Sequence, residues 1–522
     1  MDDFKARLNQ FLGLSEEEFA WRTREPSFSD LPSLDAFQSA FEAKLLFEKA
    51  KKEGYKTLIY GDYDCDGIVA TSILLAALKE FGLNVEGYIP SRYKDGYGLT
   101  LEKAKEAVEE GYQLVCTVDN GVNAFEGLEY LHEHGVLTFV LDHHEFGEKL
   151  PPMDAFLHPF ILELKEPSIS AGALAFYFSR YLLGRDDPYF ATLGALSIIS
   201  DCMDMLSYNQ KLVALSLRFI RKYRFPSLLS LMNPSSRIDE TTLGLEIIPC
   251  INAVGRIEKE PFGPLVLPYF AFQKDIQVIS KVLKEINAKR KELTKGAELG
   301  TDIDPSKWAI ALETSLPEGV NGLLANRLLF AYHKPVAVYS ESEEAKDSFV
   351  GSMRSLKGFS VIDFYKSISD LLEKAGGHEL AGGFTLKKER INEFKDALEA
   401  FALAHPMEEE NKKAMEISLD EIDFESFKAV RALGPYGLKN PVPEFLLSHY
   451  PVDQLRYSHD NQHILTYLEN GNKLVGFHMP KEKLAPDTRT VSLQGELGFD
   501  EYKGKRSIVF QIESLKEDPI EE

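Results

Sequence analysis

Three aspartates alternate with other residues in the segment Asp62-Tyr63-Asp64-Cys65-Asp66, directly before an apolar helical pattern. Because an unpaired buried charge is costly, these carboxylates need either solvent or a cation. A solvated loop is the plainest interpretation. An EF-hand calcium loop starting at Asp62 would need glutamate at its twelfth position, where the chain has Ile73. The D-x-D-x-[TV] pattern of haloacid dehalogenase phosphatases also fails, because neither register supplies Thr or Val.

Two further predicted strands end in polar groups of the same kind, Asp119-Asn120 and Asp142-His143-His144. Ligand sites in open α/β sheets lie at the carboxyl ends of the strands, so three strand ends aim acidic and imidazole groups at one crevice. Asp201, which closes the apolar helical pattern Ala191–Ile199, adds a fourth contribution. The spacing therefore predicts a single site built from carboxylates and imidazoles.

The donor types of this site indicate its chemistry. Carboxylates with one or two imidazoles and no thiolate pair suit Mn²⁺ or Mg²⁺ better than structural zinc. So many acids in one place would repel each other unless cations neutralised them. Two ions about 4 Å apart would bind both the attacking water and the phosphoryl oxygens, so we expect a two-metal hydrolytic site.

The elements that position these groups are expected between about Thr57 and His158, where short apolar runs alternate with helical patterns. Each predicted helix is followed by glycine, and Thr100 is a plausible N-cap. Such alternation predicts a parallel sheet with helices on its faces. The predicted strands are Thr57–Tyr60, Val85–Ile89, Leu114–Val118 and Leu137–Leu141, and the predicted helices are Ile68–Phe81, Leu101–Glu110 and Ala124–His134.

With 522 residues, the chain is long enough for three or four domains at about 150 residues each. We expect an N-terminal helical extension (1–50), a parallel-sheet α/β domain with helical completion and a connecting helix (51–300), a smaller α/β domain (301–404) and a C-terminal β-barrel (405–522). The barrel is predicted from five or six strands, among them His463–Leu468, Lys473–Phe477, Thr490–Leu497 and Ser507–Ile512.

The composition is that of an ordinary globular chain, with 44% hydrophobic and 27% charged residues, but 59 basic and 82 acidic residues give a net charge of −23. Residues 401–522 alone hold 14 basic and 22 acidic residues, which is −8. This balance argues against a protein that coats nucleic acid non-specifically. The N-terminus shows no signal-peptide pattern, and the longest apolar run (Ile68–Leu78) is too short to span a bilayer. The four cysteines lack C-x-x-C spacing, which argues against a disulfide framework and a zinc ribbon. We expect a soluble cytoplasmic protein.

The order Asp62–Gly67, Asp119 and Asp142-His143-His144 resembles the DHH phosphoesterase superfamily. Further motifs are similar to its RecJ-like branch of single-strand-specific exonucleases, and their joint occurrence over about residues 55 to 515 is specific where each alone would be weak. These motifs are Pro90–Leu99, Ser170–Gly172, Asn252–Arg256, Gly351–Ser355, Gly376–Gly383 and Gly434–Pro441. Gly351–Ser355 and Gly376–Gly383 resemble the DHH-associated domain, and Gly434–Pro441 resembles the entry to the OB-like nucleic-acid-binding barrel of that branch.

This resemblance implies roles for individual residues. His144 is expected to face the scissile phosphate, the alternative being that it merely packs beside His143, and Asp119 is expected to bridge two metals. The implied catalytic residues are His144, Asp64 and Asp119. The implied metal ligands are Asp62, Asp64, Asp66, Asp119, His143 and Asp201.

The implied substrate contacts are Arg92, Arg256, Ser352, Arg354, Gly376, Gly377 and His378. A guanidinium fork suits bidentate phosphate binding, although Arg92 could be an ordinary surface residue. The glycine pair with His378 could offer backbone N–H groups to a strand or form an ordinary tight turn. The chain departs from the branch at Glu318, where a histidine is usual, and at Cys65, where a small residue such as alanine is common.

The resemblance implies a Mn²⁺- or Mg²⁺-dependent 5′-to-3′ exonuclease that hydrolyses single-stranded DNA to mononucleotides in DNA repair and recombination. One alternative is a phosphodiesterase for short oligoribonucleotides or cyclic dinucleotides, but such enzymes generally lack the C-terminal barrel. Another is a non-catalytic replication scaffold, but such relatives have lost metal ligands that this chain retains.

Single-stranded DNA is the implied partner, together with a single-strand-binding protein or a helicase, no membrane, and a monomeric state. The barrel would hold the strand by stacking bases on aromatic side chains. Candidates for this role, which could equally be core residues, are Tyr436, Phe445, Tyr467 and Phe477.

Overall fold

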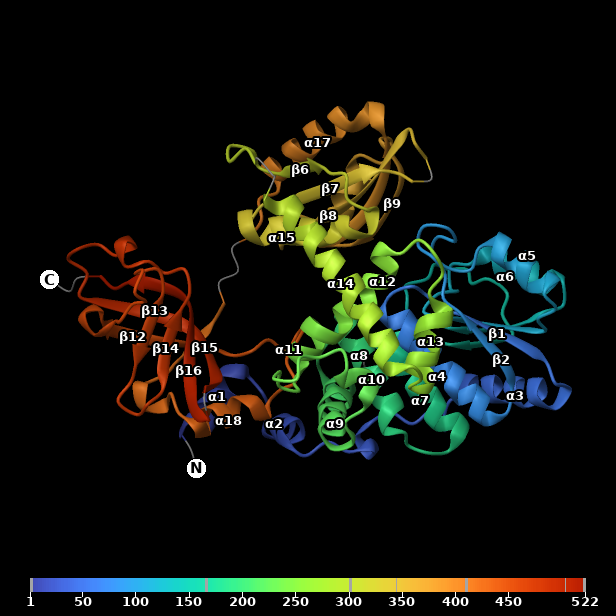
Figure 1. The fold of residues 1–522 in the computed structure, drawn as a ribbon, viewed down its shortest axis with the longest axis horizontal. Coiled ribbons are helices and arrows are strands. Elements are labelled where there is room, and N and C mark those ends of the chain that lie inside the picture. Colours follow the sequence, from blue (N-terminus) through green and yellow to red (C-terminus); the bar gives the residue numbers. More distant parts are fainter. Residues whose placement is uncertain are drawn as a thin grey trace. The chain divides into compact units, whose positions relative to one another are not determined.

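The computed structural model places the chain in two compact units (Figure 1). The smaller unit comprises Met1–Leu31, Asp204–Leu215 and Glu410–Glu522, and the larger comprises Pro32–Met203 and Ser216–Glu409. The residues described are 3–164, 168–299, 303–343, 345–408, 412–502 and 504–519.

The larger unit contains the predicted parallel sheet. Five strands run in the order β2-β1-β3-β4-β5, and every neighbouring pair is parallel. All four predicted strands are present, and the fifth is a three-residue strand that the sequence pattern did not predict. The strands are β1 (Lys56–Tyr60), β2 (Asn84–Tyr88), β3 (Leu114–Val118), β4 (Leu137–Leu141) and β5 (Ala155–Leu157).

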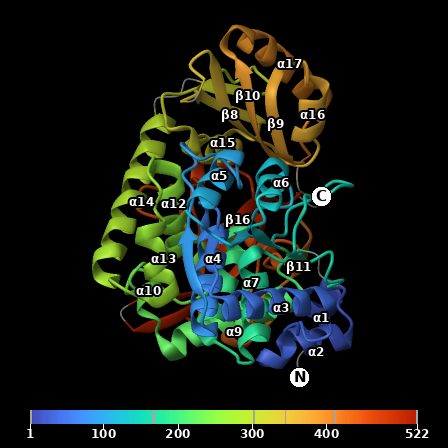
Figure 2. The ribbon, with the colours of Figure 1, turned by 90° about the vertical axis from the view of Figure 1, so that its right-hand side faces the viewer.

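Helices cover both faces of this sheet (Figures 1 and 2). Helix α4 (Cys65–Phe81) begins three residues before its predicted start because Asp64 caps it, and its side chains are buried from Cys65 to Leu78. The predicted helices α5 (Leu101–Glu109) and α6 (Phe125–Glu133) pack through an apolar cluster on the side of Tyr60 and Val140. Thr100 caps α5 by accepting a hydrogen bond from the Lys103 N–H at 3.3 Å.

Further helices complete the domain around α4, as the mostly helical pattern after Ser170 predicts. Helix α3 precedes the sheet and contacts β5. The bounds are α3 (Gln38–Glu53), α7 (Ala171–Leu183), α8 (Pro188–Ser200), α9 (Ser207–Tyr223), α10 (Pro226–Leu229), α11 (Glu240–Thr242), η2 (Leu243–Ile247), α12 (Ile248–Ile257), α13 (Gly263–Phe272) and α14 (Ile276–Leu299).

A second, mixed sheet follows α14 in the same unit, in the order β6-β7-β8-β10-β9. Only β6 and β7 pair in parallel among its described neighbours. Helix α15 (Glu318–Tyr332) follows Pro317, which fixes the entry of the chain, and has Glu318 in its first turn. The other elements are β6 (Ile310–Glu313), β7 (Val336–Glu341), β8 (Ser348–Arg354), β9 (Leu372–His378), β10 (Ala381–Lys387), α16 (Val361–Ser367) and α17 (Ile391–Ala404).

The smaller unit holds a six-stranded sheet in the order β11-β12-β15-β16-β14-β13. Its core also includes Phe4 and Leu8 of α1, and Phe4 stacks on Phe445. The elements are α1 (Asp3–Leu12), α2 (Glu16–Thr23), α18 (Phe424–Ala432), β11 (Ala414–Glu416), β12 (Glu444–Pro451), β13 (Ile464–Tyr467), β14 (Lys473–Gly476), β15 (Thr490–Tyr502) and β16 (Lys505–Glu517).

The four aromatic residues considered for base stacking divide equally in this unit. Tyr436 and Phe445 are core residues, whereas Tyr467 is 73% exposed and Phe477 is 58% exposed. Only the latter pair can offer ring faces to a ligand.

Among the helices that the structure describes, none has both the length and the apolar run required to cross a membrane.

Candidate metal centre and active site

The first aspartate cluster is fixed by the turn between β1 and α4. Asp64 is the N-cap of α4, and its carboxylate accepts a hydrogen bond from the Gly67 N–H at 3.1 Å. A Cβ atom on Gly67 would lie 2.6 Å from the Asp62 Cβ, so only glycine lets the first turn of α4 pack against Asp62. The local sequence therefore brings the Asp62 and Asp64 carboxylates together at the end of β1.

Asp66 points to the start of α7 and is held by three donors. Its Oδ2 accepts a hydrogen bond from the Ala171 N–H at 2.9 Å, and its Oδ1 accepts one from the Gly172 N–H at 2.7 Å. The Ser197 hydroxyl of α8 donates to the same Oδ1 at 2.6 Å. Backbone N–H groups at a helix N-terminus stabilise an anion, so this arrangement fixes the orientation of the carboxylate.

The ends of β3 and β4 supply the other ligand groups. Asp119 adopts a left-handed backbone conformation, with φ of 62°, directly after β3. Asp142 is fully buried and accepts hydrogen bonds from the Val122 N–H at 3.0 Å and the His143 N–H at 2.8 Å. The Asp142 Oδ1 also contacts the His144 Nδ1 at 2.8 Å, which orients that ring.

These groups converge as the sequence predicts. The His143 Nε2 lies 3.2 Å from the Asp119 Oδ1, 3.5 Å from the Asp66 Oδ2 and 3.5 Å from the Asp201 Oδ2. The cluster contains three sets of possible metal ligands, and within each set the ligand atoms lie within 4.8 Å of one another. The sets are Asp119 with His143 and His144, Asp66 with His143 and Asp201, and Asp62 with Asp64 and Asp119. Asp119 therefore links the carboxylates of β1 to the histidines of β4.

The electrostatics of the cluster fit divalent cations. Burial and the neighbouring carboxylates raise the pKa of Asp62 to about 8 and that of Asp201 to about 8, and they raise the pKa of Asp119 well above its usual range. Burial lowers the pKa of His143, so its neutral, metal-binding form is favoured.

Three buried atoms of the cluster, the Asp62 Oδ1, the Asp119 Oδ1 and the His143 Nε2, have no hydrogen-bond partner in the part of the chain that the structure describes. Of these atoms, the Asp119 Oδ1 and the His143 Nε2 lie 3.2 Å from each other. Converging, unsatisfied oxygen and imidazole atoms are the donor set that Mn²⁺ or Mg²⁺ prefers, so the residues present fit such ions.

His144 lies at the open side of the cluster. Burial alone would lower its pKa, but the hydrogen bond with Asp142 and the surrounding carboxylates raise the pKa to about 9. Tyr97, which the sequence motifs did not single out, places its hydroxyl 3.1 Å from the His144 Nε2. The only signal for Tyr97 was its place within the motif Pro90–Leu99.

Three arginines gather near the cluster. The Arg92 guanidinium lies 4.3 Å from the centre of the Tyr63 ring, and its Nε donates to the Gly255 carbonyl at 3.3 Å. Burial, followed by the charge of Arg92, lowers the pKa of Arg256 to about 10, and Arg354 adds to that effect. Like charges held together in this way need an anion between them.

Ser352 and Arg354 alternate along β8 and both lie against Gly322 of α15. The start of α15 in turn packs on the backbone of Arg256, since a Cβ atom on Gly319 would lie 2.7 Å from the Arg256 carbonyl oxygen. The second α/β domain therefore contributes to the arginine group through direct packing.

The predicted contacts Gly376, Gly377 and His378 lie at the exposed end of the edge strand β9. They pair with Ala381–Gly383 in a β-hairpin, so they belong to a strand and not to the turn itself. None of them belongs to any of the four sets of possible metal ligands found among the described residues.

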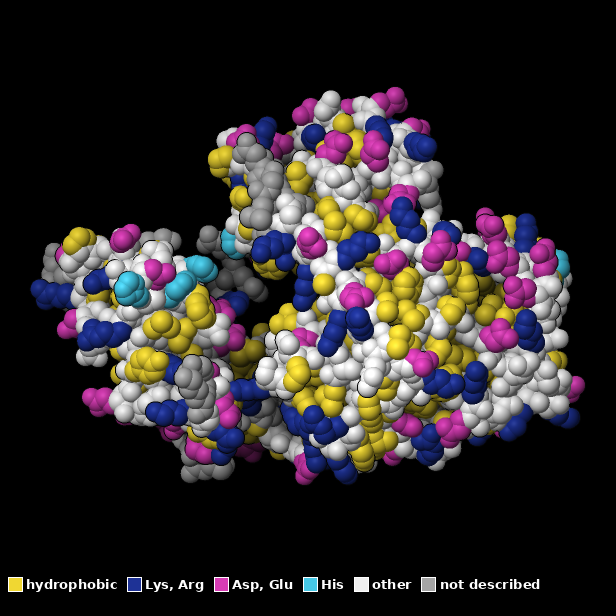
Figure 3. All heavy atoms as spheres, viewed as in Figure 1, with side chains coloured by type: hydrophobic (Ala, Val, Ile, Leu, Met, Phe, Trp, Pro, Cys, Tyr) yellow, Lys and Arg dark blue, Asp and Glu magenta, His cyan; other side chains and the backbone are white. Residues whose placement is uncertain are grey.

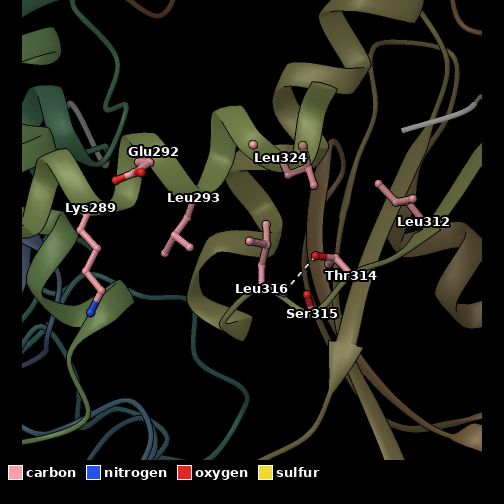
Figure 4. Close-up of a pocket in the computed structure, with 9 residues that line it drawn as sticks. Lys289, Glu292, Leu293, Leu312, Thr314, Ser315, Leu316 and Leu324 are labelled. Atoms are coloured by element: carbon pink, nitrogen blue, oxygen red, sulfur yellow. Dashed lines mark hydrogen bonds between the residues drawn. The ribbon is translucent and has the colours of Figure 1, made fainter. Parts of the chain in front are cut away.

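A cavity of about 680 Å³ lies elsewhere, between α14 and the segment from β6 to α15 (Figure 4). Lys289 and Leu293 line it from α14, and Thr314 faces them, accepting a hydrogen bond from the Leu316 N–H at 3.0 Å. No residue predicted to bind metal or substrate lines this cavity.

The hydrogen bond from Ser197 to Asp66 provides a test of the positioning just described. We expect Ser197→Ala to weaken Mn²⁺ binding by roughly 10- to 100-fold, because groups that orient a metal ligand typically contribute that much. Mn²⁺ titration followed by thermal unfolding measures this directly. Ser179→Ala removes a buried serine bonded only within α7 and is the matched control. Equal Mn²⁺ affinity in the two variants would contradict the assignment.

Family models match three parts of the chain: the DHH family N-terminal domain at residues 56–199, the DHHA1 domain at 306–404 and the RecJ OB domain at 414–514. The fold and the cluster thus define a DHH-type α/β protein, and the predicted fold class is confirmed.

Individual relatives narrow this class. The single-stranded-DNA-specific exonuclease RecJ of Thermus thermophilus is 31% identical over 87% of this chain and 68% of its own length. The Bacillus subtilis RecJ is 29% identical over 90% of this chain, which spans about 63% of that relative's length. The crystal structure of Thermus thermophilus RecJ in complex with Mn²⁺ superposes with a TM-score of 0.83 at 26% identity, covering 99% of this chain and 78% of that one. The chain belongs to the RecJ family.

Proposed function

We propose that the chain is a metal-dependent exonuclease that hydrolyses single-stranded DNA to mononucleotides from the 5′ end. The observation that carries this proposal is the buried cluster in which Asp119 joins two sets of metal-ligand groups beside three arginines. The relatives named single-stranded-DNA-specific exonucleases support the choice of substrate.

Two ions would be held by Asp66, His143 and Asp201 on one side of the cluster and by Asp62 and Asp64 on the other, with Asp119 within reach of both sets. Bound Mn²⁺ or Mg²⁺ ions would supply a nucleophile at neutral pH and stabilise charge on the phosphoryl oxygens. The α7 N-terminus and Ser197 keep Asp66 directed at its ion.

His144 is the group proposed to contact the scissile phosphate. Asp142 holds the ring through Nδ1, which leaves Nε2 directed toward the open side and Tyr97. In this position the ring can donate a hydrogen bond to a phosphoryl oxygen and stabilise the charge that develops there.

Arg92, Arg256, Ser352 and Arg354 are proposed to hold the phosphate at the end of the strand. Their guanidinium groups supply planar, bidentate donors, and the phosphate would offset their mutual repulsion. The exposed Gly376, Gly377 and His378 of β9 would meet the strand further along. The exposed rings of Tyr467 and Phe477 would stack on bases in the same sequence-tolerant manner.

We further propose a role in DNA repair and recombination, a cytoplasmic location, a monomeric state, and cooperation with a single-strand-binding protein or a helicase. The domain limits proposed for this function are 1–50, 51–300, 301–404 and 405–522. Each follows from the predicted architecture and the family resemblance.

The experiment that tests the activity uses 5′-phosphorylated single-stranded DNA with Mn²⁺, labelled at one end or the other, beside the Asp64→Ala variant. We expect mononucleotides from the 5′ label first and no release by the variant. Release from the 3′ label first, or equal activity of the variant, would contradict the proposal. Preferential hydrolysis of short oligoribonucleotides or cyclic dinucleotides would favour the alternative phosphodiesterase.

A further inference from the structure

One segment outside the candidate active site carries basic residues with no acidic residue among them. Residues 205–238 contain six basic residues and no acidic residue, although the whole chain carries a net charge of −23. Five of the six lie in the larger unit, around the C-terminal half of α9. Figure 3 shows Lys and Arg side chains gathered over the α9 region.

The five cations form one surface, which we call the α9 patch: Arg218, Arg221, Lys222, Arg224 and Arg237. All five side chains are exposed. The first three are spaced i, i+3 and i+4 along α9, so they share one face of the helix. Arg221 donates a hydrogen bond to the Ile238 carbonyl, which holds the loop that carries Arg237 against the helix.

Two acidic residues that follow the patch in sequence accept hydrogen bonds from backbone N–H groups. Asp239 caps α11 by accepting a hydrogen bond from the Thr242 N–H at 2.8 Å. Glu246 accepts hydrogen bonds from the Asn233 N–H at 2.6 Å and from the Ser236 hydroxyl. Like charges spaced i, i+4, as in Arg218 and Lys222, destabilise a helix. The arrangement is therefore unfavourable for the helix itself and suits an external polyanion.

The fold fixes the position of the α9 patch relative to the metal centre. Helix α8 ends beside Asp201, while its start lies against the α9–α10 region, since Tyr189 contacts the Ser227 hydroxyl at 2.8 Å and the Ser216 hydroxyl donates to the Ala191 carbonyl at 3.0 Å. Thirteen residues of α8 separate the two ends, which is about 20 Å at 1.5 Å per residue. A strand whose end lies in the active site would reach the patch only several nucleotides away.

We infer that the α9 patch binds the sugar-phosphate backbone of the DNA strand at a distance from the end being cut. This inference rests on the proposed function. Arginine predominates, and its planar fork suits phosphate. Tyr223, at the end of α9, is 47% exposed, and its ring lies beside these cations, with the Lys222 ammonium 5.0 Å from the ring centre and Phe225 stacked at 5.8 Å. These features favour nucleic acid over an acidic protein segment as the occupant.

The test compares Arg218→Gln/Lys222→Gln with Lys49→Gln/Lys52→Gln, a control with the same charge change on the exposed face of α3. Affinity for a long single strand is measured without metal, by fluorescence anisotropy over a series of salt concentrations. We expect the patch variant to bind several-fold more weakly, with the slope of log K against log salt reduced by about 0.7 for each phosphate that the variant no longer neutralises. The control should keep the wild-type slope.

A second readout separates this inference from the proposed function. Hydrolysis of a tetranucleotide with Mn²⁺, which ends before the patch, should be equal in wild type and patch variant, whereas a strand ten times as long should be cut less efficiently by the variant. Unchanged affinity and salt slope in the patch variant would overturn the inference. Failure of every form to cut DNA would overturn the proposed function alone, since the binding measurement does not require hydrolysis.

Discussion

Replacing Asp119 with asparagine should abolish DNA hydrolysis and remove the stabilisation by Mn²⁺. Asp119 is 3% exposed and is the one residue shared by the His143–His144 set and the Asp62–Asp64 set among the described ligand groups. Asparagine keeps the size of the side chain and tolerates the left-handed backbone at this position. We expect a loss of more than 100-fold in activity, beyond the 10- to 100-fold typical of residues that only orient a ligand.

When metal is removed, the Asp119→Asn variant should be at least as stable as wild type. Burial and neighbouring carboxylates raise the pKa values of Asp62, Asp119 and Asp201, which shows that these groups destabilise one another as anions. In EDTA, Asp119→Asn should therefore unfold at the same temperature as wild type or above it. Wild type should gain about 2.7 kcal/mol when Mn²⁺ is at 100 times its Kd, and the variant should gain little.

Asp186→Asn is the matched control, because this aspartate is exposed and pairs only with Arg180 among the ion pairs described. It should retain both activity and the Mn²⁺-dependent rise in unfolding temperature. An Asp119→Asn protein that keeps the Mn²⁺-dependent rise would show that Asp119 is not a shared ligand.

The strand ends of the candidate site were predictable from the sequence for a physical reason. In a parallel sheet the carboxyl ends of the strands lie at one edge, so Asp62, Asp119 and Asp142 had to meet once the apolar runs before them were read as strands. Asp201 was predictable because it directly follows an apolar helix whose length could be read from its pattern.

The groups that hold these ligands were not predictable in the same way. Asp66 is fixed by Ala171 and Ser197, which lie 105 and 131 residues further along the chain. Tyr97 meets His144 across 47 residues. Pairings of this kind depend on how helices pack on the sheet, and no local period encodes them. A serine within the mainly apolar α8, one turn before Asp201, was the available signal for Ser197.

The predicted strand boundaries were wrong where polar residues extend a strand. The strands β15 and β16 each have thirteen residues, although the apolar alternation covers only Thr490–Leu497 and Ser507–Ile512. The ladder continues through charged residues to the pair Tyr502 and Lys505, and the preceding pair, Glu501 and Arg506, forms a salt bridge at 3.2 Å. Cross-strand pairing stabilises these ends, whereas their composition resembles that of a loop.

Replacing Arg256 with glutamine should lower kcat/KM for a 5′-phosphorylated strand by about 100-fold. Burial and the charge of Arg92 lower the pKa of Arg256 to about 10, so the Arg256 guanidinium gains from the negative charge of a bound phosphate. Removing one partner of a buried, charge-assisted contact costs about 2 to 5 kcal/mol, and 1.36 kcal/mol corresponds to a factor of ten. A strand with a 5′-hydroxyl lacks that phosphate and should lose far less.

The preference for the 5′-phosphorylated strand, measured as a ratio of kcat/KM values, is therefore the decisive quantity. Arg256→Lys keeps the charge but not the planar fork, so its ratio should lie between those of wild type and Arg256→Gln. Arg185→Gln is the control, because Arg185 pairs with Glu80 and Asp187 at the surface. Equal losses on both strands in Arg256→Gln would assign the arginine to the packing of α15 against α12, since Gly319 lies against its backbone. A selective loss on the phosphorylated strand would instead make the arginine group the element that recognises the end of the substrate.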